Sequence, residues 1–285
     1  MKNSVSLSGI VVGAVRLMQH NAKAIGISVA CFTMLSGAAS AYTSRGIDAV
    51  EQTLAVHFGM TRDDFETTMQ QEINRMNALD LQAFVREIRN RAGEPTIASG
   101  VTIPGDQLGM VYIARVGPKL LMLVAIDCLA FFVAYVFFLI VFTRGNISPY
   151  EAAAQLPMQV LSQILLACYA LIRSLIWIPA IGFLIAMYYV PRLSLAPVVM
   201  ASGESGATES LRMSLARTKG AWFTVATSLM GILLIIALML WPALVVVASV
   251  SLFSFKLSFI VWLASLYALL AFFAAAQTML AVMLV

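Results

Sequence analysis

The sequence predicts an all-α, polytopic membrane protein. We expect six transmembrane helices arranged as three hairpins, each preceded by an amphipathic interfacial helix, and a small helical extramembrane insertion. Hydrophobic residues make up 61% of the 285 residues and charged residues only 11%, whereas a soluble domain is about half apolar and a quarter charged. The apolar residues also form runs of the length that a transmembrane helix needs, about 20 residues. This composition argues against a disordered chain, a nucleic-acid-binding domain and a typical cytosolic enzyme.

Five apolar runs supply the six expected spans. The third run is too long for one helix and suits two, because Ile178-Pro179-Ala180-Ile181-Gly182 forms a natural turn near its middle. Each of the last two runs predicts one long helix, with a kink at Pro242 in the first of them. The runs are residues 24–42, 120–142, 158–200, 221–252 and 257–285.

The distribution of charge predicts the orientation. With six spans, residues 1–23, 143–157 and 201–220 share one side, and they carry seven basic and three acidic residues. Residues 43–118 lie on the other side, with seven basic and ten acidic residues. The excess of Lys and Arg marks the cytoplasmic side of a membrane protein. We therefore expect a protein of the bacterial inner membrane, with both termini cytoplasmic and residues 43–118 periplasmic.

The N-terminal segment has a second interpretation. Residues 24–37 could be the apolar region of a signal peptide, and Ala39-Ser40-Ala41 fits a cleavage site with small residues. The 23 residues before it are long and apolar for the start of a signal peptide. Retention as a transmembrane helix is therefore the favoured prediction, and cleavage stays open.

Three amphipathic stretches precede the odd-numbered spans, at residues 4–21, 148–157 and 206–220. The second begins with Ser148 and Glu151 at the spacing of a capping box. The first and third align without a gap at an offset of 196 residues, whereas the second lacks their basic pair. A basic amphipathic helix lies naturally at the membrane surface, although it could instead be a linker that packs on the bundle. The predicted headgroup contacts are Arg16, Lys23, Arg212, Arg217 and Lys219.

Residues 43–118 form the insertion between the first two spans. A short helix over residues 47–58 is expected to stop at Gly59. A capping box at residues 61–64 begins a longer amphipathic helix, which Gly93 and Pro95 are expected to end. Residues 96–118 contain Pro and Gly breaks and few strand signals. The apolar face of the long helix either packs on the membrane helices or docks a membrane-protein partner.

The sequence offers little that could carry enzyme chemistry. His20 and His57 fall on opposite sides of the membrane in this topology, so no histidine-based metal site or triad is expected, and no cofactor is predicted. Polar residues within spans are costly and often functional. An Asp127–Arg173 pair could fix helix packing or form a substrate or lipid site. The intramembrane candidates are Asp127, Arg173, Arg192 and Gln277.

One stretch resembles a known family. A proline-containing turn, an Arg-containing helix, a small acidic loop and a helix with a Ser…Lys-Gly ending occur in that order at Pro179, Arg192, Glu204, Ser214, Lys219 and Gly220. This pattern is similar to that of the membrane domain of bacterial glycerophosphodiester phosphodiesterases and its stand-alone inner-membrane relatives. The resemblance covers about residues 145–285 and implies a six-helix membrane domain without the soluble catalytic domain of those enzymes.

These observations divide the chain into residues 1–42, with an amphipathic helix and the first span, residues 43–118, the periplasmic insertion, and residues 119–285, with spans two to six. The leading hypothesis is a non-enzymatic scaffold or accessory subunit of a membrane complex. Membrane phospholipids and a membrane protein bound through residues 43–118 are its expected partners, and nucleic acid is not. The alternative is a small transporter or lipid-handling protein that uses Asp127, Arg173 and Arg192.

Overall fold

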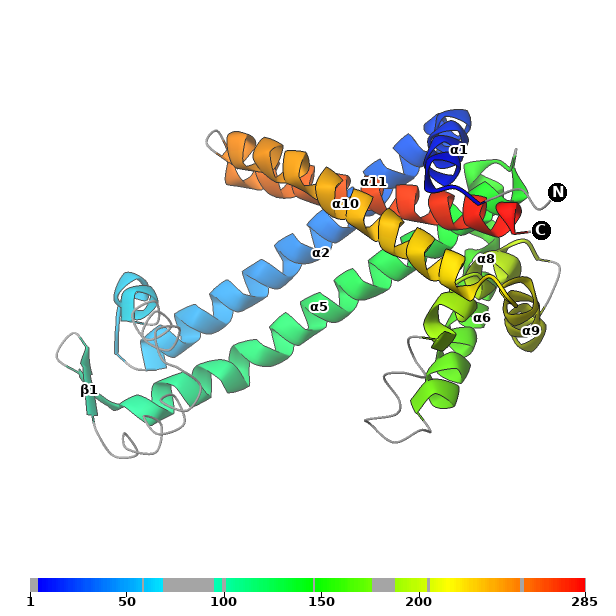
Figure 1. The fold of residues 1–285 in the computed structure, drawn as a ribbon. Helices are drawn as coiled ribbons and strands as arrows, with labels where there is room; N and C mark the ends of the chain where they lie inside the picture. The colour runs from blue at the N-terminus through cyan, green and yellow to red at the C-terminus, as the bar shows by residue number, and fades with distance from the viewer. Residues whose placement is uncertain are drawn as a thin grey trace. The chain divides into compact units, whose positions relative to one another are not determined.

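The computed structural model describes residues 5–57, 59–68, 95–98, 101–145, 147–175, 188–203, 206–251 and 254–284. For residues 95–98, 101–113 and 170–175 it describes the backbone alone. The described chain is helical except for two short strands and the connecting turns (Figure 1). The predicted helical class is therefore confirmed.

Four helices in the described part of the chain are long and apolar enough to cross a membrane. They are α2 (Ala22–His57), the segment Ala114–Arg144 of α5 (Gly105–Arg144), α10 (Trp222–Ser251) and α11 (Phe255–Met283). Each exceeds the roughly 20 residues that a bilayer core requires. A membrane-embedded protein follows from these four helices, and they coincide with the first, second, fourth and fifth predicted runs.

The predicted hairpin over residues 158–200 is not confirmed. Helix α6 (Pro149–Leu175) joins the second amphipathic stretch to the start of this run as one continuous helix. The expected turn at residues 178–182 lies outside the described residues. Beyond it, a helical segment over 188–193 is followed by a turn at Ser194 and Leu195 and by the six-residue helix α8 (Ala196–Ala201). Residues 188–201 therefore do not form one continuous helix.

The chain consists of two compact units that divide within α2 and α5. One unit comprises residues Ala38–Asp127, and the other comprises Met1–Gly37 and Cys128–Val285. The predicted insertion, residues 43–118, falls inside the first of these units. Both boundaries interrupt helices rather than loops, because α2 continues to His57 and α5 already begins at Gly105.

The smaller unit, Ala38–Asp127, contains the predicted insertion, residues 43–118. The predicted helices over 24–42 and 47–58 are one helix, because the polar residues between them end the apolar run without breaking the backbone. Gly59, at φ 67°, follows the helix end as predicted. The Thr61 hydroxyl accepts the Asp64 backbone N–H at 3.2 Å, which confirms the helix start there.

Two strands, β1 (Pro95–Ala98) and β2 (Val101–Pro104), pair antiparallel with Ala98 opposite Val101. The sequence contained few strand signals here, so this short antiparallel pair was not predicted. Helix α5 begins directly after β2 and includes Pro118. Most of the predicted amphipathic helix, residues 69–88, lies outside the described residues.

The larger unit has its core where α2, α5 and α11 meet. The Tyr267 ring of α11 is fully buried and stacks on Phe131 of α5, with ring centroids 4.6 Å apart. It also stacks on Phe32 of α2 at 5.7 Å. The Tyr267 hydroxyl is 2.6 Å from the Ser36 hydroxyl of α2. One aromatic residue therefore joins three helices through packing and through a hydrogen bond that satisfies its polar end.

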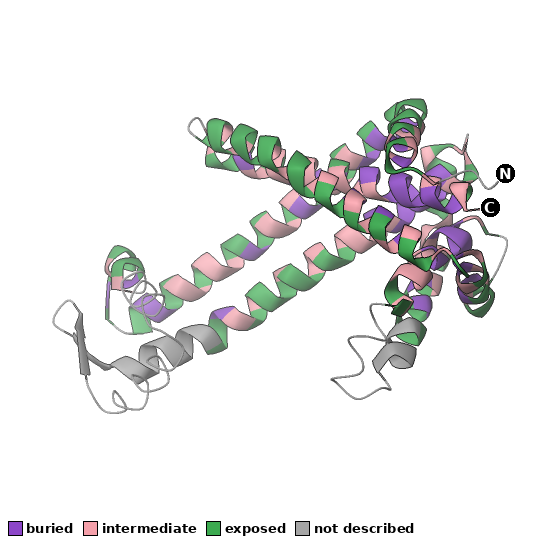
Figure 2. Cartoon of the chain, in the orientation of Figure 1, coloured by how far each residue is buried: buried purple, intermediate pink, exposed green. Residues whose placement is uncertain are grey.

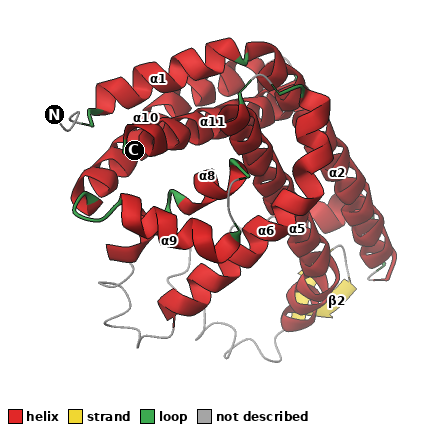
Figure 3. Cartoon of the chain, turned by 90° about the vertical axis from the view of Figure 1, so that its right-hand side faces the viewer, coloured by secondary structure: helices red, strands yellow, loops and turns green. Residues whose placement is uncertain are grey.

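Helix α1 (Leu7–His20) packs on the α10–α11 hairpin (Figure 3). Gly9 and Gly13 are one helical turn apart and face Met283 and Met279 of α11. A Cβ atom on Gly13 would lie 2.4 Å from the Met279 Cε atom, so the absence of a side chain permits the close approach. Helix α1 therefore docks on the bundle, while Val12 and Val15 on its other side stay exposed.

Helix α10 leaves most of its apolar surface uncovered (Figure 2). Three of its residues, Val225, Ser228 and Ile232, are buried, against twelve residues of α11. The largest exposed side chain, Trp241, is 71% exposed. So large an apolar surface is compatible with acyl chains or a membrane-protein neighbour around it, rather than with water.

Candidate functional site

Arg192 is held by the end of α9 (Ala207–Arg217). Its Nη2 donates to the Leu215 carbonyl oxygen at 2.8 Å, and its Nη1 donates to the Tyr188 hydroxyl at 2.6 Å. The Ser214 hydroxyl donates to the Arg192 carbonyl oxygen in return. A guanidinium at a helix C-terminus satisfies carbonyl groups that have no partner within the helix. Arg192 therefore fixes α9 against residues 188–192.

The predicted Asp127–Arg173 pair is not tested, because the Arg173 side chain is outside the description. Asp127 lies in α5, at the end of the smaller unit. Its Oδ1 atom is buried and has no hydrogen-bond partner among the described residues. Arg192 belongs to the larger unit. A joint site of Asp127, Arg173 and Arg192 therefore stays a prediction.

Gln277 takes part in a polar contact between helices. Its Oε1 atom accepts a hydrogen bond from the Tyr135 hydroxyl of α5, and its own side chain, on α11, is buried. Interhelical hydrogen bonds of this kind hold membrane helices together. Gln163 does the same between α6 and α8, because its Nε2 donates to the Pro197 carbonyl oxygen at 2.9 Å.

The five predicted headgroup cations all lie in the larger unit, on or next to α1 and α9. The described ion pairs both involve Arg62 of the smaller unit, so within the described chain none of these five cations has an acidic partner. Four of them are exposed, and Arg217 is partly buried. Unpaired cations of this kind attract anionic surfaces. The exposed four are Arg16, Lys23, Arg212 and Lys219.

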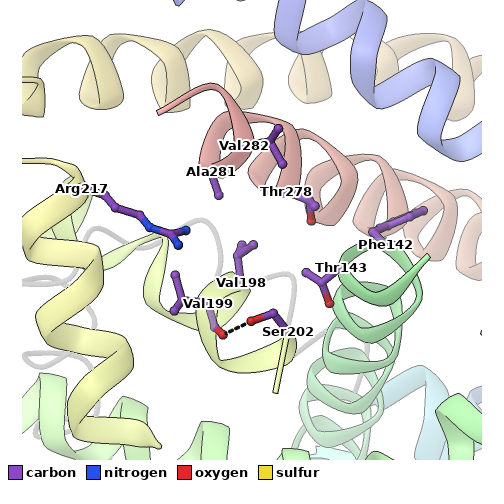
Figure 4. Close-up of a pocket in the computed structure, with 9 residues that line it drawn as sticks. All are labelled: Phe142, Thr143, Val198, Val199, Ser202, Arg217, Thr278, Ala281 and Val282. Atoms are coloured by element: carbon purple, nitrogen blue, oxygen red, sulfur yellow. Dashed lines mark hydrogen bonds between the residues drawn. The ribbon is translucent and has the colours of Figure 1, made fainter. Parts of the chain in front are cut away.

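A pocket of about 180 Å³ lies beside Arg217 (Figure 4). It is bounded by the C-terminal ends of α5 and α11, by α8 and by the end of α9. The Arg217 side chain extends from α9 toward the space in this view. The lining residues are Phe142, Thr143, Val198, Val199, Ser202, Arg217, Thr278, Ala281 and Val282.

The hydroxyl groups at the pocket already donate to the backbone. Thr143 donates to the Leu139 carbonyl oxygen at 2.7 Å, Ser202 to that of Val199 at 2.7 Å, and Thr278 to that of Ala274 at 2.9 Å. Each hydroxyl therefore has only acceptor capacity left. No lining residue is acidic, and Arg217 is the charged donor among them. Among the lining side chains, recognition of an anion would therefore depend on Arg217.

Aromatic residues lie at the end of the membrane helices where the pocket is found. Trp222 begins α10, and its ring lies 5.7 Å from the Tyr188 ring and 5.8 Å from the Phe223 ring. Trp and Tyr are enriched where the bilayer meets water. The pocket lies at this end too, since Thr143 is next to the last residue of α5 and Val282 is next to the last residue of α11.

No protein-family model matches the chain, and no curated protein or solved structure matches it significantly. The resemblance to the phosphodiesterase membrane domain therefore stays a prediction. Within the described residues, no group of three or more His, Cys, Asp or Glu side chains could hold a metal ion.

The sequence predicted Arg217 as a headgroup contact, but it did not predict the pocket beside it. The residues that line it come from four separate segments, and only the fold brings them together. The Gly9–Gly13 spacing was visible in the sequence as a small-residue motif, which is a recognised signal for close helix contact. Tyr135, Ser36 and Tyr267 carried no signal of that kind, because tyrosine and serine occur in spans for several reasons.

Proposed function

We propose that this chain is a non-enzymatic, multi-pass protein of the bacterial inner membrane. It acts as a scaffold or accessory subunit of a membrane complex and contacts anionic phospholipids. The observation that carries the proposal is the combination of four apolar helices with cations on or next to α1 and α9 that have no acidic partner within the described chain. Cations next to a membrane span lower their free energy by about 1 kcal/mol each near an anionic leaflet.

The accessory role rests on surfaces that the described chain leaves uncovered. Helix α10 exposes apolar side chains along its length, with Leu234, Leu238 and Val245 between 58% and 62% exposed. Lipid can cover such a helix, and so can another membrane protein. Between α2 and α11 of the larger unit, Ser36 and Tyr267 instead form a buried polar pair. A packed bundle with uncovered outer faces suits a structural subunit better than a transport path.

The orientation follows from the same cations. We place both termini, α1 and α9 in the cytoplasm and the Ala38–Asp127 unit largely in the periplasm, because basic residues are in excess on the first side.

Contacts among α6, α8 and α9 favour four spans over six. Leu166, from the middle of α6, shares a buried cluster with Leu211 of the polar helix α9. A residue at the centre of a span would not reach a helix at the membrane surface.

The number of spans can be tested at the predicted turn. In a cysteine-free background, Ala180→Cys should react with an impermeant thiol reagent from the cytoplasmic side if residues 145–221 do not cross the membrane. Reaction from the periplasmic side would support the six-span prediction and overturn the four-span proposal. Ser44→Cys and Arg212→Cys provide the periplasmic and cytoplasmic references.

A transporter or lipid-handling role is the second candidate, and Asp127 is the observation that favours it. An ionisable side chain with an unpartnered buried oxygen inside a span is costly unless it has a function. Asp127→Cys should resist water-soluble thiol reagents in a scaffold. Labelling at this position, blocked when a substrate is added, would favour the transporter and contradict the scaffold.

The accessory role is tested by extraction in a mild detergent. A partner should co-purify with the full chain at a fixed ratio. Replacing residues 58–104, which connect α2 to α5, with a flexible linker should release that partner while both helices remain. A chain that runs alone as a monomer, with no difference between the two forms, would contradict the accessory role.

A further inference from the structure

Arg217 differs in its surroundings from the other four cations that were predicted to contact headgroups. Arg16, Lys23, Arg212 and Lys219 are exposed and attract anions only as surface charges. Arg217 is partly buried at the rim of a space of about 180 Å³. One buried water needs about 10–15 Å³ of such space, so this pocket can hold a larger group.

Arg217 itself has no partner that would occupy it. It makes no hydrogen bond or ion pair with another described residue, although the nearby Arg144 Nε donates to the Ala201 carbonyl oxygen at 3.1 Å. Its planar guanidinium presents a fork of donors that matches the oxygen atoms of a phosphate. A guanidinium withdrawn partly from water, without a counter-ion, favours an external anion in its place.

The surroundings of the pocket favour a lipid as the source of that anion. One side is apolar, with Phe142, Val198 and Ala281. Val282 at the rim is 61% exposed on the outer surface of α11. Trp222 and Tyr188 indicate that this end of the helices lies near the membrane–water boundary. A phosphate at Arg217 could therefore continue into acyl chains along the apolar surface.

We propose that this pocket binds the phosphate group of one anionic glycerophospholipid, with Arg217 as the residue that recognises it. The proposal deepens the proposed lipid contact and rests on the membrane orientation given above. It adds a saturable site with a stoichiometry of one lipid per chain, whereas the exposed cations attract lipids collectively and without a fixed number.

The test uses the full chain, purified without lipid in a neutral detergent, and native mass spectrometry with dioleoylphosphatidylglycerol. Wild type should retain one lipid in a saturable manner. Arg217→Gln should weaken this binding about tenfold to 100-fold, which is the loss expected for charge-assisted hydrogen bonds. Ala281→Leu should weaken it similarly, because it fills the pocket and leaves every charge in place.

Arg212→Gln is the matched control, since it removes one exposed positive charge from the same helix. It should change the affinity of the saturable site by less than about threefold, as expected for a screened surface charge. Equal effects of Arg212→Gln and Arg217→Gln, with none from Ala281→Leu, would overturn the pocket and leave collective lipid attraction intact. If phosphatidylglycerol binds no better than phosphatidylcholine in any variant, both the pocket and the proposed lipid contact fail.

Two further arms distinguish the source of the phosphate and the integrity of the fold. Inorganic phosphate should not displace the lipid at millimolar concentrations. Displacement would identify a soluble anion as the ligand and contradict the lipid. Arg217→Lys retains the charge but loses the fork of donors, so it should bind with intermediate affinity. If Arg217→Gln does not fold, wild-type affinity in Arg217→Lys and Ala281→Leu would overturn the proposal.

Discussion

At the residue scale, two pairs of polar side chains join membrane helices of the larger unit. The Tyr267 hydroxyl contacts Ser36 at 2.6 Å, and Tyr135 donates to Gln277. Both pairs connect α11 to another candidate span. A polar group without a partner in hydrocarbon is costly, so these pairs specify which helix faces meet. Gln277 could be singled out from the sequence, but its partner could not, because the pairing depends on the fold.

Tyr267→Phe tests the contribution of one such pair. The variant keeps the stacked ring and removes the hydrogen bond to Ser36, so the free energy of unfolding should fall by about 0.5–1.5 kcal/mol. Tyr169→Phe, at an exposed position of α6, should change it by less than about 0.5 kcal/mol. Unfolding in bicelles measures both variants. Equal effects would show that the Ser36 contact contributes nothing specific.

Glu151 predicts a dependence of stability on pH. Hydrogen bonds from the Ser148 backbone N–H and then from its hydroxyl lower the pKa of the Glu151 carboxyl group. A carboxylate with a lowered pKa in the folded state stabilises the protein above its unfolded pKa, and that contribution is lost as the pH falls through the folded pKa. Wild type should therefore lose more stability than Glu151→Gln on acidification from pH 7 to pH 3. Parallel stability curves for the two proteins would contradict this capping role.

At the element scale, helix continuity and apolar run length proved to be different quantities. Residues 24–42 were predicted as one helix and 47–58 as another, but α2 passes through the polar residues between them. An apolar run reports how much of a helix suits the bilayer core. The end of a helix depends on backbone signals, such as Gly59 in the left-handed region. The same distinction explains why α5 starts well before Leu120.

Helix α1 illustrates a contact that depends on two small residues. Gly13→Val should destabilise the protein by about 1–3 kcal/mol, because the added side chain must displace Met279 of α11 or move α1 away. Gly26→Val is the matched control, since nothing lies within 4 Å of a Cβ atom there and the change in helix propensity is the same. Unfolding in bicelles again provides the measurement. A contact that matters little would give the two variants the same stability.

At the scale of the whole molecule, the sequence predicted the membrane class, the helical fold and the four helices that are long and apolar enough to span a membrane. Composition and run length determine these, since they reflect the transfer of side chains into lipid. The segment 158–200 was harder to predict, because α6 is apolar in part and also carries buried polar residues such as Gln163. The pocket was not predictable, because it requires residues from α5, α8, α9 and α11 to meet.

The cations predicted to contact lipid headgroups are mostly exposed in the structure. The alignment of the first and third amphipathic stretches pairs Arg16 with Arg212 and Lys23 with Lys219. All four of these side chains are exposed. Arg16 and Arg212 lie on α1 and α9, whereas Lys23 is at the start of α2 and Lys219 follows the end of α9. Helix α1 packs on the α10–α11 hairpin, and α9 leads into α10. This placement supports one cationic surface around the ends of the membrane helices, as the lipid proposal requires.

The lipid composition around the protein is the most direct test of the proposed contact with anionic phospholipids. Wild type and a variant with Gln at Arg16, Lys23, Arg212, Arg217 and Lys219 would be extracted in polymer-bounded native membrane discs, and their phospholipids quantified by mass spectrometry. Wild type should carry a higher ratio of anionic to zwitterionic lipid than the variant, with the excess reduced in high salt. The same ratio around both proteins would contradict the proposed contact.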